Sequence, residues 1–342
     1  MSSIYNQLNQ YLKEEKAVVL WQRFQKNSIF SQLFTVDQLA QAPPLVARAW
    51  QQKRLIWHTA GEKWERAEPF FPPPLLYILG GGHVSQALAA LAAIVKLPVV
   101  VIDDRQEFAN KELFPRAKQV ICSPFVEALA NLELGPSSFV VLATRGHQYD
   151  HDCLRALLPK TLAYLGMVGS QKKVQELKQV LEEEGFPPAR LASLHAPVGI
   201  PIGALTPAEI GVSILAEIIA EKRRLFPAEE ANREVLAAAA ELAAAGKQGI
   251  MVSIVQTKGS TPRKPGARML VYPGGQVIGT IGGGKGEAEA KEQALLALAE
   301  GENRLCHLDL TNSAAGEEGM VCGGSMDLVL ENMALLRAGG TC

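Results

Sequence analysis

The stretch that decides the fold is LLYILGGGHVSQ, at Leu75–Gln86. An apolar run of strand length ends abruptly in three glycines, and a segment compatible with a helix follows. About twenty residues later a second apolar run, VVVIDDR at Val99–Arg105, ends in two aspartates. Strand, glycine turn, helix, strand and acidic tip form the first half of a dinucleotide-binding fold. The middle of the chain is therefore predicted to hold a nucleotide or a guest of similar shape.

Apolar runs alternate with helical patterns over residues 75–225, which predicts a doubly wound parallel sheet covered by helices on both faces. The strands expected there are Leu75–Leu79, Val99–Asp103, Gln119–Ile121, Phe139–Leu142 and Thr161–Met167. The helices expected there are Val84–Ile94, Pro124–Asn131, His151–Leu158, Lys172–Glu184 and Pro207–Arg224. The fold class is α/β, with a smaller α+β domain beside the Rossmann-like sheet.

The flanking segments read as α+β, and we divide the chain into residues 1–70, a Rossmann-like domain at 71–226 and an α+β domain at 230–342. EPFFPPP, at 68–74, is expected to be an extended connector because of its prolines. The order of helix and strand in 1–70 resembles that in 230–342. We interpret residues 1–70 as a degenerate copy without the glycine loops; because helix–strand order is common, coincidence is the alternative.

Composition excludes several classes of protein. The 34 basic and 35 acidic side chains give a net charge of −1, so a nucleic-acid partner is not expected. Apolar runs stay short of eighteen residues, so no membrane span is expected. The first residues lack the basic-then-apolar order of a signal peptide, and the five cysteines are dispersed. Together these features predict a cytoplasmic protein.

The glycine turn offers the first candidate ligands. Gly80 permits a tight turn, Gly82 lets the backbone approach a phosphate, and a small residue at Ser85 lets helix and strand pack closely. Asp103 or its neighbour Asp104 could accept hydrogen bonds from ribose hydroxyls, or could be a solvated strand end. His83 could touch phosphate or cap the helix.

Loops that follow later strands of a doubly wound sheet line the same crevice. In TRGHQYD, at 144–150, Arg145 could grip a phosphate or carboxylate and His147 could titrate near neutrality. Asp150 could orient His147 or cap a helix. YLGMVGSQKK, at 164–173, also favours an anion, and HAPVGIPIG, at 195–203, is a further loop that converges on the crevice if the fold is right.

The C-terminal domain carries three loops rich in glycine or proline. KGSTPRKPGAR, at 258–268, crowds Arg263, Lys264 and Arg268 into a loop stiffened by two prolines. GTIGGGKGEAE, at 279–289, opens a helix with Gly283, Gly284 and Lys285 and has the form of an anion cradle, although it lacks Walker A spacing. EGMVCGGS, at 318–325, places Cys322 beside two glycines, either as a ligand or as a buried thiol.

Taken together, these strings resemble the XdhC/CoxI family of accessory proteins for molybdenum hydroxylases such as xanthine dehydrogenase. The resemblance covers roughly residues 68–225, as the Rossmann-like domain, and 234–335, as the CoxI-type domain. Its strings are EPFFPPPLLYILGGGHVSQAL, VIDDRQEFAN, TRGHQYD, YLGMVGSQKK, HAPVGIPIGALTPAEI, TKGSTPRKPGARMLV, GTIGGGKGEAE and EEGMVCGGSMDL.

Two departures from the family pattern matter. The CoxI-type domain usually comes first, whereas here it follows the Rossmann-like domain. Relatives often carry cysteine where this chain has Lys285, which puts direct sulfur transfer in doubt.

The resemblance implies a maturation factor that binds the molybdenum cofactor, a phosphorylated pterin (molybdopterin) or its dinucleotide, and delivers it to a client. The implied partners are a xanthine dehydrogenase-like hydroxylase and, as a second candidate, a cysteine desulfurase; a homodimer is expected. This favours a cofactor-binding chaperone over a stand-alone catalyst. The alternatives are an NAD(P)-dependent oxidoreductase, with His147 or His195 as acid or base, and a nucleotide-sensing scaffold.

The candidate cofactor ligands share glycine backbone, positive charge or a titratable side chain, and we expect both clusters to grip one guest. They are Gly80, Gly82, His83, Asp103, Arg145, His147, Arg263, Lys264, Arg268, Gly283, Gly284, Lys285 and Cys322, with no catalytic or metal-ligating residue assigned.

Overall fold

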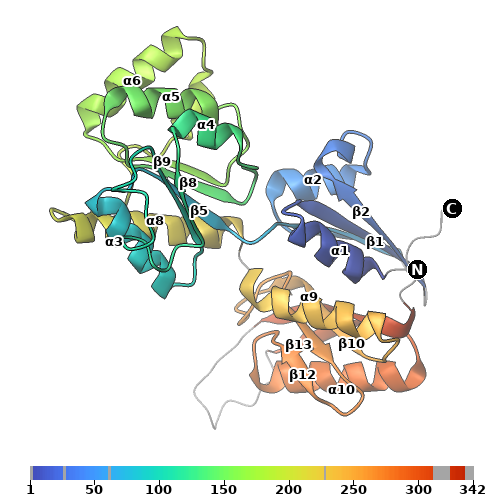
Figure 1. Ribbon diagram of the computed structural model, residues 1–342. Coiled ribbons are helices and arrows are strands. Elements are labelled where there is room, and N and C mark those ends of the chain that lie inside the picture. Colours follow the sequence, from blue (N-terminus) through green and yellow to red (C-terminus); the bar gives the residue numbers. More distant parts are fainter. Residues whose placement is uncertain (1–2, 26–27, 61–62, 227–228, 311–323, 336–342) are drawn as a thin grey trace. The chain divides into compact units, whose positions relative to one another are not determined.

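The computed structural model describes residues 3–25, 28–60, 63–226, 229–310 and 324–335 (Figure 1). The chain divides into two compact units. The first, here called the double unit, combines Met1–Pro72 with Ala228–Cys342, and the second, the Rossmann unit, is Pro73–Pro227.

The Rossmann unit is built on a five-stranded parallel sheet in the order β7-β6-β5-β8-β9. Every residue of β6 and β8 is buried, which explains their unbroken apolar sequence. The strand order reverses between β5 and β8, and in such sheets ligands bind at the carboxyl ends of the strands at this point. The strands are β5 (Leu75–Leu79), β6 (Val99–Asp103), β7 (Gln119–Cys122), β8 (Ser138–Leu142) and β9 (Tyr164–Met167).

Helices cover both faces of this sheet. Helices α4, α5 and α6 share one core cluster with the strands, while α3 packs against α8. A Cβ added at Gly211 of α8 would lie only 3.2 Å from the Cβ of Ala87 in α3, so the glycine permits this close approach. The helices are α3 (His83–Ile94), α4 (Phe125–Ala130), α5 (His147–Leu157), α6 (Gln171–Glu183), α7 (Pro188–Ala192) and α8 (Pro207–Leu225). The predicted α/β class and parallel sheet are confirmed.

The double unit contains two antiparallel sheets. The first has the order β2-β1-β4-β3 and the second the order β12-β11-β10-β14-β13. The first half comprises α1 (Ile4–Lys13), β1 (Val18–Gln25), β2 (Ser28–Thr35), η1 (Val36–Gln38), α2 (Pro44–Gln52), β3 (Ile56–Ala60) and β4 (Lys63–Phe70). The second half comprises α9 (Glu229–Ala244), β10 (Ile250–Lys258), β11 (Arg268–Val271), β12 (Val277–Gly279), α10 (Gly284–Glu300), β13 (Arg304–Asp309), β14 (Ser325–Asn332) and η2 (Met333–Leu335).

The two halves share one topology. Leaving aside β12 and the short 3-10 helices, each half runs helix, two strands, helix, two strands, and the strand order β2-β1-β4-β3 has its counterpart in β11-β10-β14-β13. Helices α1 and α9 belong to one core cluster, in which Ile4, Tyr5 and Leu8 join Val235 and Leu236. The two halves therefore build a common core.

The proline-rich connector begins later than expected. Glu68, Pro69 and Phe70 belong to β4 and pair with β1. Strand β3 stops pairing at Ala67, so β4 has a single paired neighbour at Pro69. A residue without an N–H group is tolerated at such an edge. Strand β2 lacks a clear apolar alternation in its sequence, because a polar residue, Ser31, occupies one of its buried positions.

Buried charges link the two halves of the double unit. Arg66 of β4 is fully buried; its Nε donates to Gln22 at 2.6 Å and its Nη2 pairs with Glu331 of β14. Glu331 also accepts hydrogen bonds from Gln22, at 2.8 Å, and from Tyr5. Burial and the carboxylate of Glu331 raise the pKa of Tyr5, so its hydroxyl stays a donor.

We expect Glu331→Gln to destabilise the double unit by about 3 kcal/mol or more, because it leaves the buried guanidinium of Arg66 without a counter-charge. Urea unfolding followed by tryptophan fluorescence measures this, since Trp21, Trp50, Trp57 and Trp64 all lie in this unit. The control is Glu65→Gln, which removes a half-exposed pair with Arg23 and should cost about 0.5 kcal/mol. Equal losses in the two variants would contradict the expectation.

Candidate functional site

The three glycines after β5 differ in how much space a side chain would have at each position. A Cβ at Gly80, whose φ is +108°, would lie 2.2 Å from the carbonyl oxygen of Ala143, and one at Gly81 would lie 2.1 Å from that of Phe108. Neighbouring backbone therefore requires glycine at both positions. A Cβ at Gly82 would have no described atom within 4 Å. The open position beside the first turn of α3 is thus Gly82.

The first turn of α3 can receive an anion. Gly82 is the N-cap residue, and no described side chain caps this helix end. His83 is its first residue and is exposed. Backbone N–H groups at an uncapped helix N-terminus favour a negative charge. The predicted phosphate contacts at Gly82 and His83 are compatible with this geometry.

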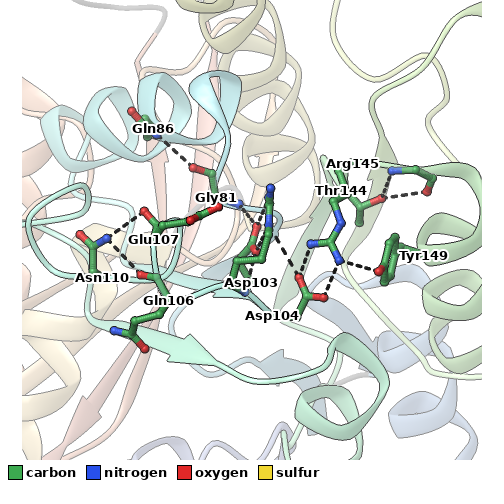
Figure 2. A network of polar contacts seen from close by, with 12 residues as sticks. Gly81, Gln86, Asp103, Asp104, Gln106, Glu107, Asn110, Thr144, Arg145 and Tyr149 are labelled. Atoms are coloured by element: carbon green, nitrogen blue, oxygen red, sulfur yellow. Dashed lines mark hydrogen bonds and ion pairs between the residues drawn. The ribbon is translucent and has the colours of Figure 1, made fainter.

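Asp103 holds the glycine turn rather than facing a ligand. The carboxyl is 1% exposed; one oxygen accepts from the Gly81 N–H at 2.8 Å, and Arg105 binds both oxygens (Figure 2). Because each oxygen of the Asp103 carboxylate already accepts two hydrogen bonds from the protein, it has no acceptor capacity left for ribose hydroxyls. The expectation that Asp103 binds the guest directly is therefore not supported, and its contacts make it a positioning residue.

Asp104 and Arg145 form an ion pair across the switch point. The guanidinium binds both carboxylate oxygens, at 2.5 and 2.8 Å, and also reaches the hydroxyl of Tyr149 (Figure 2). Asp104 follows β6 and Arg145 lies beyond β8, the two neighbours of β5. The hydrogen bond from Arg145 lowers the pKa of Asp104. The pair spans the central strand, and Arg145 is about one third exposed, so a phosphate could compete for it.

The loop after β8 differs from expectation. Helix α5 begins at His147, four residues earlier than predicted, with Gly146 as N-cap. His147 is exposed in the first turn. Asp150 is buried and binds the hydroxyl of Thr144, at 2.6 Å, and the ammonium of Lys173, at 2.5 Å. The interpretation that Asp150 orients His147 is wrong, because both carboxylate oxygens are engaged elsewhere.

Arg268 lies in the interior of the double unit. Its side chain is fully buried and pairs with Glu68 of β4, and its Nη1 also donates to the carbonyl oxygen of Gly266. An arginine placed in this way cannot grip a guest, so the assignment of Arg268 as a cofactor ligand is wrong. Its neighbours Arg263 and Lys264 are exposed.

The second glycine turn is filled by the protein itself. One oxygen of Glu287 accepts from the Thr280 hydroxyl at 2.5 Å, from the Gly283 N–H at 3.0 Å and from the Ile281 N–H at 3.1 Å. Burial would raise the pKa of Glu287, but these hydrogen bonds outweigh it and the pKa is lowered. The turn is an anion cradle, as its sequence predicts, but its anion here is a side chain of the same chain. Gly283, Gly284 and Lys285 remain exposed.

Three loops of the double unit meet. A Cβ at Gly282 would lie 2.6 Å from Cγ of Pro262, and one at Gly324 would lie 2.4 Å from the carbonyl oxygen of Lys258. The basic loop, the glycine turn and the start of β14 are thus neighbours, as a common site would require. Cys322 lies outside the described residues. The prediction that this cluster and the Gly80–His83 turn grip one guest stays a prediction.

Family models match two parts of this chain. The XdhC Rossmann domain matches residues 76–218, and the XdhC and CoxI family matches residues 242–309. The chain belongs to the XdhC and CoxI family. In this XdhC-family chain the CoxI-type part follows the Rossmann part, as the sequence predicts.

Three relatives of this XdhC-family chain match it over part of their length. An uncharacterized protein, YqeB of Escherichia coli, is 39% identical over 44% of this chain and 27% of its own length. A protein of Bacillus subtilis named as a probable subunit of xanthine dehydrogenase is 34% identical over 45% and 44%. The molybdenum cofactor insertion chaperone PaoD of Escherichia coli is 30% identical over 30% and 32%. The matched part of this chain thus spans less than half of each relative.

Among solved structures, a xanthine dehydrogenase from Bacillus halodurans aligns with a TM-score of 0.46 and 24% identity, over 64% of this chain and 65% of that chain. Within the described residues, no helix combines the length and the apolar character needed to cross a membrane.

We expect the contribution of Glu287 to stability to depend on pH. Because folding lowers its pKa, the contribution is present above the ordinary value of 4.5 and is lost as the pH falls through the lowered value. Glu287→Gln should cost about 1 kcal/mol at pH 7 and progressively less below pH 4.5. Urea unfolding at several pH values tests this, with the exposed Glu292→Gln as control; a loss that does not change with pH would contradict it.

Proposed function

We propose that this protein binds the molybdenum cofactor through the phosphate of the pterin and delivers it to a molybdenum hydroxylase of the xanthine dehydrogenase kind. The observation that carries the proposal is the open Gly82 position beside the first turn of α3, next to the exchangeable ion pair of Asp104 and Arg145. Membership of the XdhC and CoxI family and the likeness to the chaperone PaoD support it.

Binding at the Rossmann unit is an exchange of anions. The backbone around Gly82 and His83 offers N–H groups to the phosphate, and Arg145 leaves Asp104 to bind it as a second, bidentate donor. The pair is partly open to solvent, with Arg145 about one third exposed, and the phosphate replaces the carboxylate as its partner, so the exchange is feasible. His147, exposed in the first turn of α5, is available to the same guest. The cofactor supplies molybdenum chemistry in the client enzyme, and this chain supplies the cradle.

The basic loop of the double unit is a separate candidate site for an anion. Arg263, Lys264 and Lys285 are exposed, and the loops that carry them are neighbours. Gly283 and Gly284 open α10 next to these loops, so a phosphate bound by the double unit would find cations and a helix N-terminus there. Glu287 would have to yield part of its hydrogen bonding to such a phosphate.

We further infer that residues 1–70 are a degenerate copy of the CoxI-type half. The shared order of elements and the matching strand order support this. Between its second strand and its second helix the first half carries TVDQLAQAPP, at 35–44, where the second half carries the glycine turn. The copy keeps the scaffold and the common core, while the second half keeps the anion cradle.

The NAD(P) alternative has less support. A dinucleotide dehydrogenase uses the acidic strand tip to bind ribose hydroxyls, and the carboxylate of Asp103 is occupied by Gly81 and Arg105. Titration with NADH is the direct comparison, and tight binding of NADH with turnover of a carbonyl compound would favour the oxidoreductase.

We expect freshly purified protein to release molybdopterin on denaturation, detected by mass spectrometry, and to bind it at micromolar concentration in equilibrium dialysis. Arg145→Ala should raise the Kd about tenfold or more, since it removes a charge-assisted bidentate contact. Asp104→Asn should bind at least as tightly as the wild type, because it frees Arg145.

The matched control is Arg155→Ala, an exposed arginine of α5 that pairs with Glu184 and should leave the Kd unchanged. Absence of binding at micromolar protein would refute the proposal. Equal effects of the Arg145 and Arg155 variants would refute the assignment of the site.

A further inference from the structure

A partly buried carboxylate of α8 organises the edge of the Rossmann unit that follows β9. Glu217 places Oε1 2.8 Å from Nδ1 of His195, and its Oε2 accepts from the hydroxyl of Tyr164 and from the N–H of Gly199, both at 2.6 Å. Burial would raise the pKa of Glu217, yet these hydrogen bonds outweigh it and the pKa is lowered. The carboxylate is thus an ionised acceptor on both oxygens.

The backbone at His195 continues the parallel sheet. His195 bridges to Gly166; its N–H donates to Leu165 at 3.0 Å, and its carbonyl oxygen accepts from Met167 at 2.9 Å. The N–H of Val198 then donates to Met167 at 3.0 Å. Residues 195–198 therefore run beside β9, joined to it by an isolated parallel bridge and two flanking hydrogen bonds, which fixes the position of the His195 backbone.

The imidazole of His195 is held on two sides. Its ring lies 4.5 Å from that of Tyr164, between centroids, and Glu217 engages Nδ1. A Cβ at Gly166 would lie 2.5 Å from Val198 and 2.8 Å from the ring of Tyr164, so glycine is required for this packing. Because a carboxylate can only accept, Nδ1 carries a proton, and in the neutral imidazole Nε2 then presents a lone pair.

The lone pair of Nε2 has no described hydrogen-bond donor, and the side chain of His195 is 31% exposed. The imidazole is also not needed to fasten its loop. Gly199 is already bound by Glu217, and the hydroxyl of Ser213 donates to the carbonyl oxygen of Ile200 at 2.6 Å. Nε2 of His195 is therefore a fixed and accessible hydrogen-bond acceptor, and the packing of the fold does not account for it.

We propose that Nε2 of His195, held by Glu217, accepts a hydrogen bond or a proton from an N–H or O–H group of the heterocycle bound by the Rossmann unit. This rests on the proposed function and deepens it. The sheet order places residues 195–198 beyond β9, about 14 Å from β5 at the usual strand spacing. Elongated guests of such sheets lie along this carboxyl edge, with their phosphate at the glycine turn.

A metal-binding role fits less well. One imidazole supplies a single ligand, and the described residues contain no group of three His, Cys, Asp or Glu side chains placed to share an ion. An acceptor for a heterocycle needs only the geometry that is present.

The test is His195→Asn. The asparagine amide can donate to Glu217 in place of Nδ1–H, so the loop keeps its anchor, but nothing replaces Nε2. Equilibrium dialysis with molybdopterin at pH 7.5 should show a Kd at least tenfold higher than for the wild type, at an unchanged melting temperature. The control is His151→Asn, another histidine of this unit that faces a carboxylate, Glu184, and it should bind as the wild type does.

Equal Kd values for the wild type and His195→Asn would overturn this inference and leave the proposed function standing. Failure of the wild type to bind molybdopterin would overturn both. If the variant does not fold, nitrogen NMR of the wild-type imidazole decides. If the resonance of an unprotonated Nε2 shifts on addition of molybdopterin, the inference is supported. If the Nε2 resonance does not change, the inference is overturned.

Discussion

The structure depends on carboxylates that pair with its own cations and backbone amides. Asp103 holds the glycine turn after β5, Glu287 fills the turn before α10, and Glu331 balances a buried arginine between the two halves of the double unit. Buried donors must find acceptors, because an unpaired one costs most of its lost hydration. The near balance of 34 basic and 35 acidic residues allows so many internal pairs.

This internal pairing changes how an anion site is recognised. A lysine, an arginine or a glycine-rich helix start marks a place where negative charge is stable, but the negative charge can come from the same chain. Arg268 and Lys173 are of this kind, since each is held by a carboxylate in a buried or largely buried pair. Arg145 differs because its pair with Asp104 is partly open to solvent. Exposure of the pair, rather than its presence, decides whether a guest can exchange with the carboxylate.

The two halves of the double unit divide the work between scaffold and site. Both supply a helix to the common core, through Tyr5 and Leu8 on one side and Val235 and Leu236 on the other. The glycine turn and the exposed cations belong to the second half. In the Rossmann unit, Asp103 at the end of β6 holds the glycine turn, and Glu217 of α8 holds the imidazole of His195.

The sequence by itself determined the Rossmann unit almost strand by strand. Strands β5 and β6 begin and end where the apolar runs do, because a strand covered on both faces needs apolar residues at successive positions, and such a run is visible in the local sequence. It also determined which loops are rich in charge and glycine, and it showed Ser213 and Glu217 as polar residues four apart in an otherwise apolar stretch of α8. Only the tertiary structure decided the partners. Arg145 meets Asp104 from 41 residues away and Arg268 meets Glu68 from 200 residues away, because strand order, which no local pattern encodes, brings these positions together.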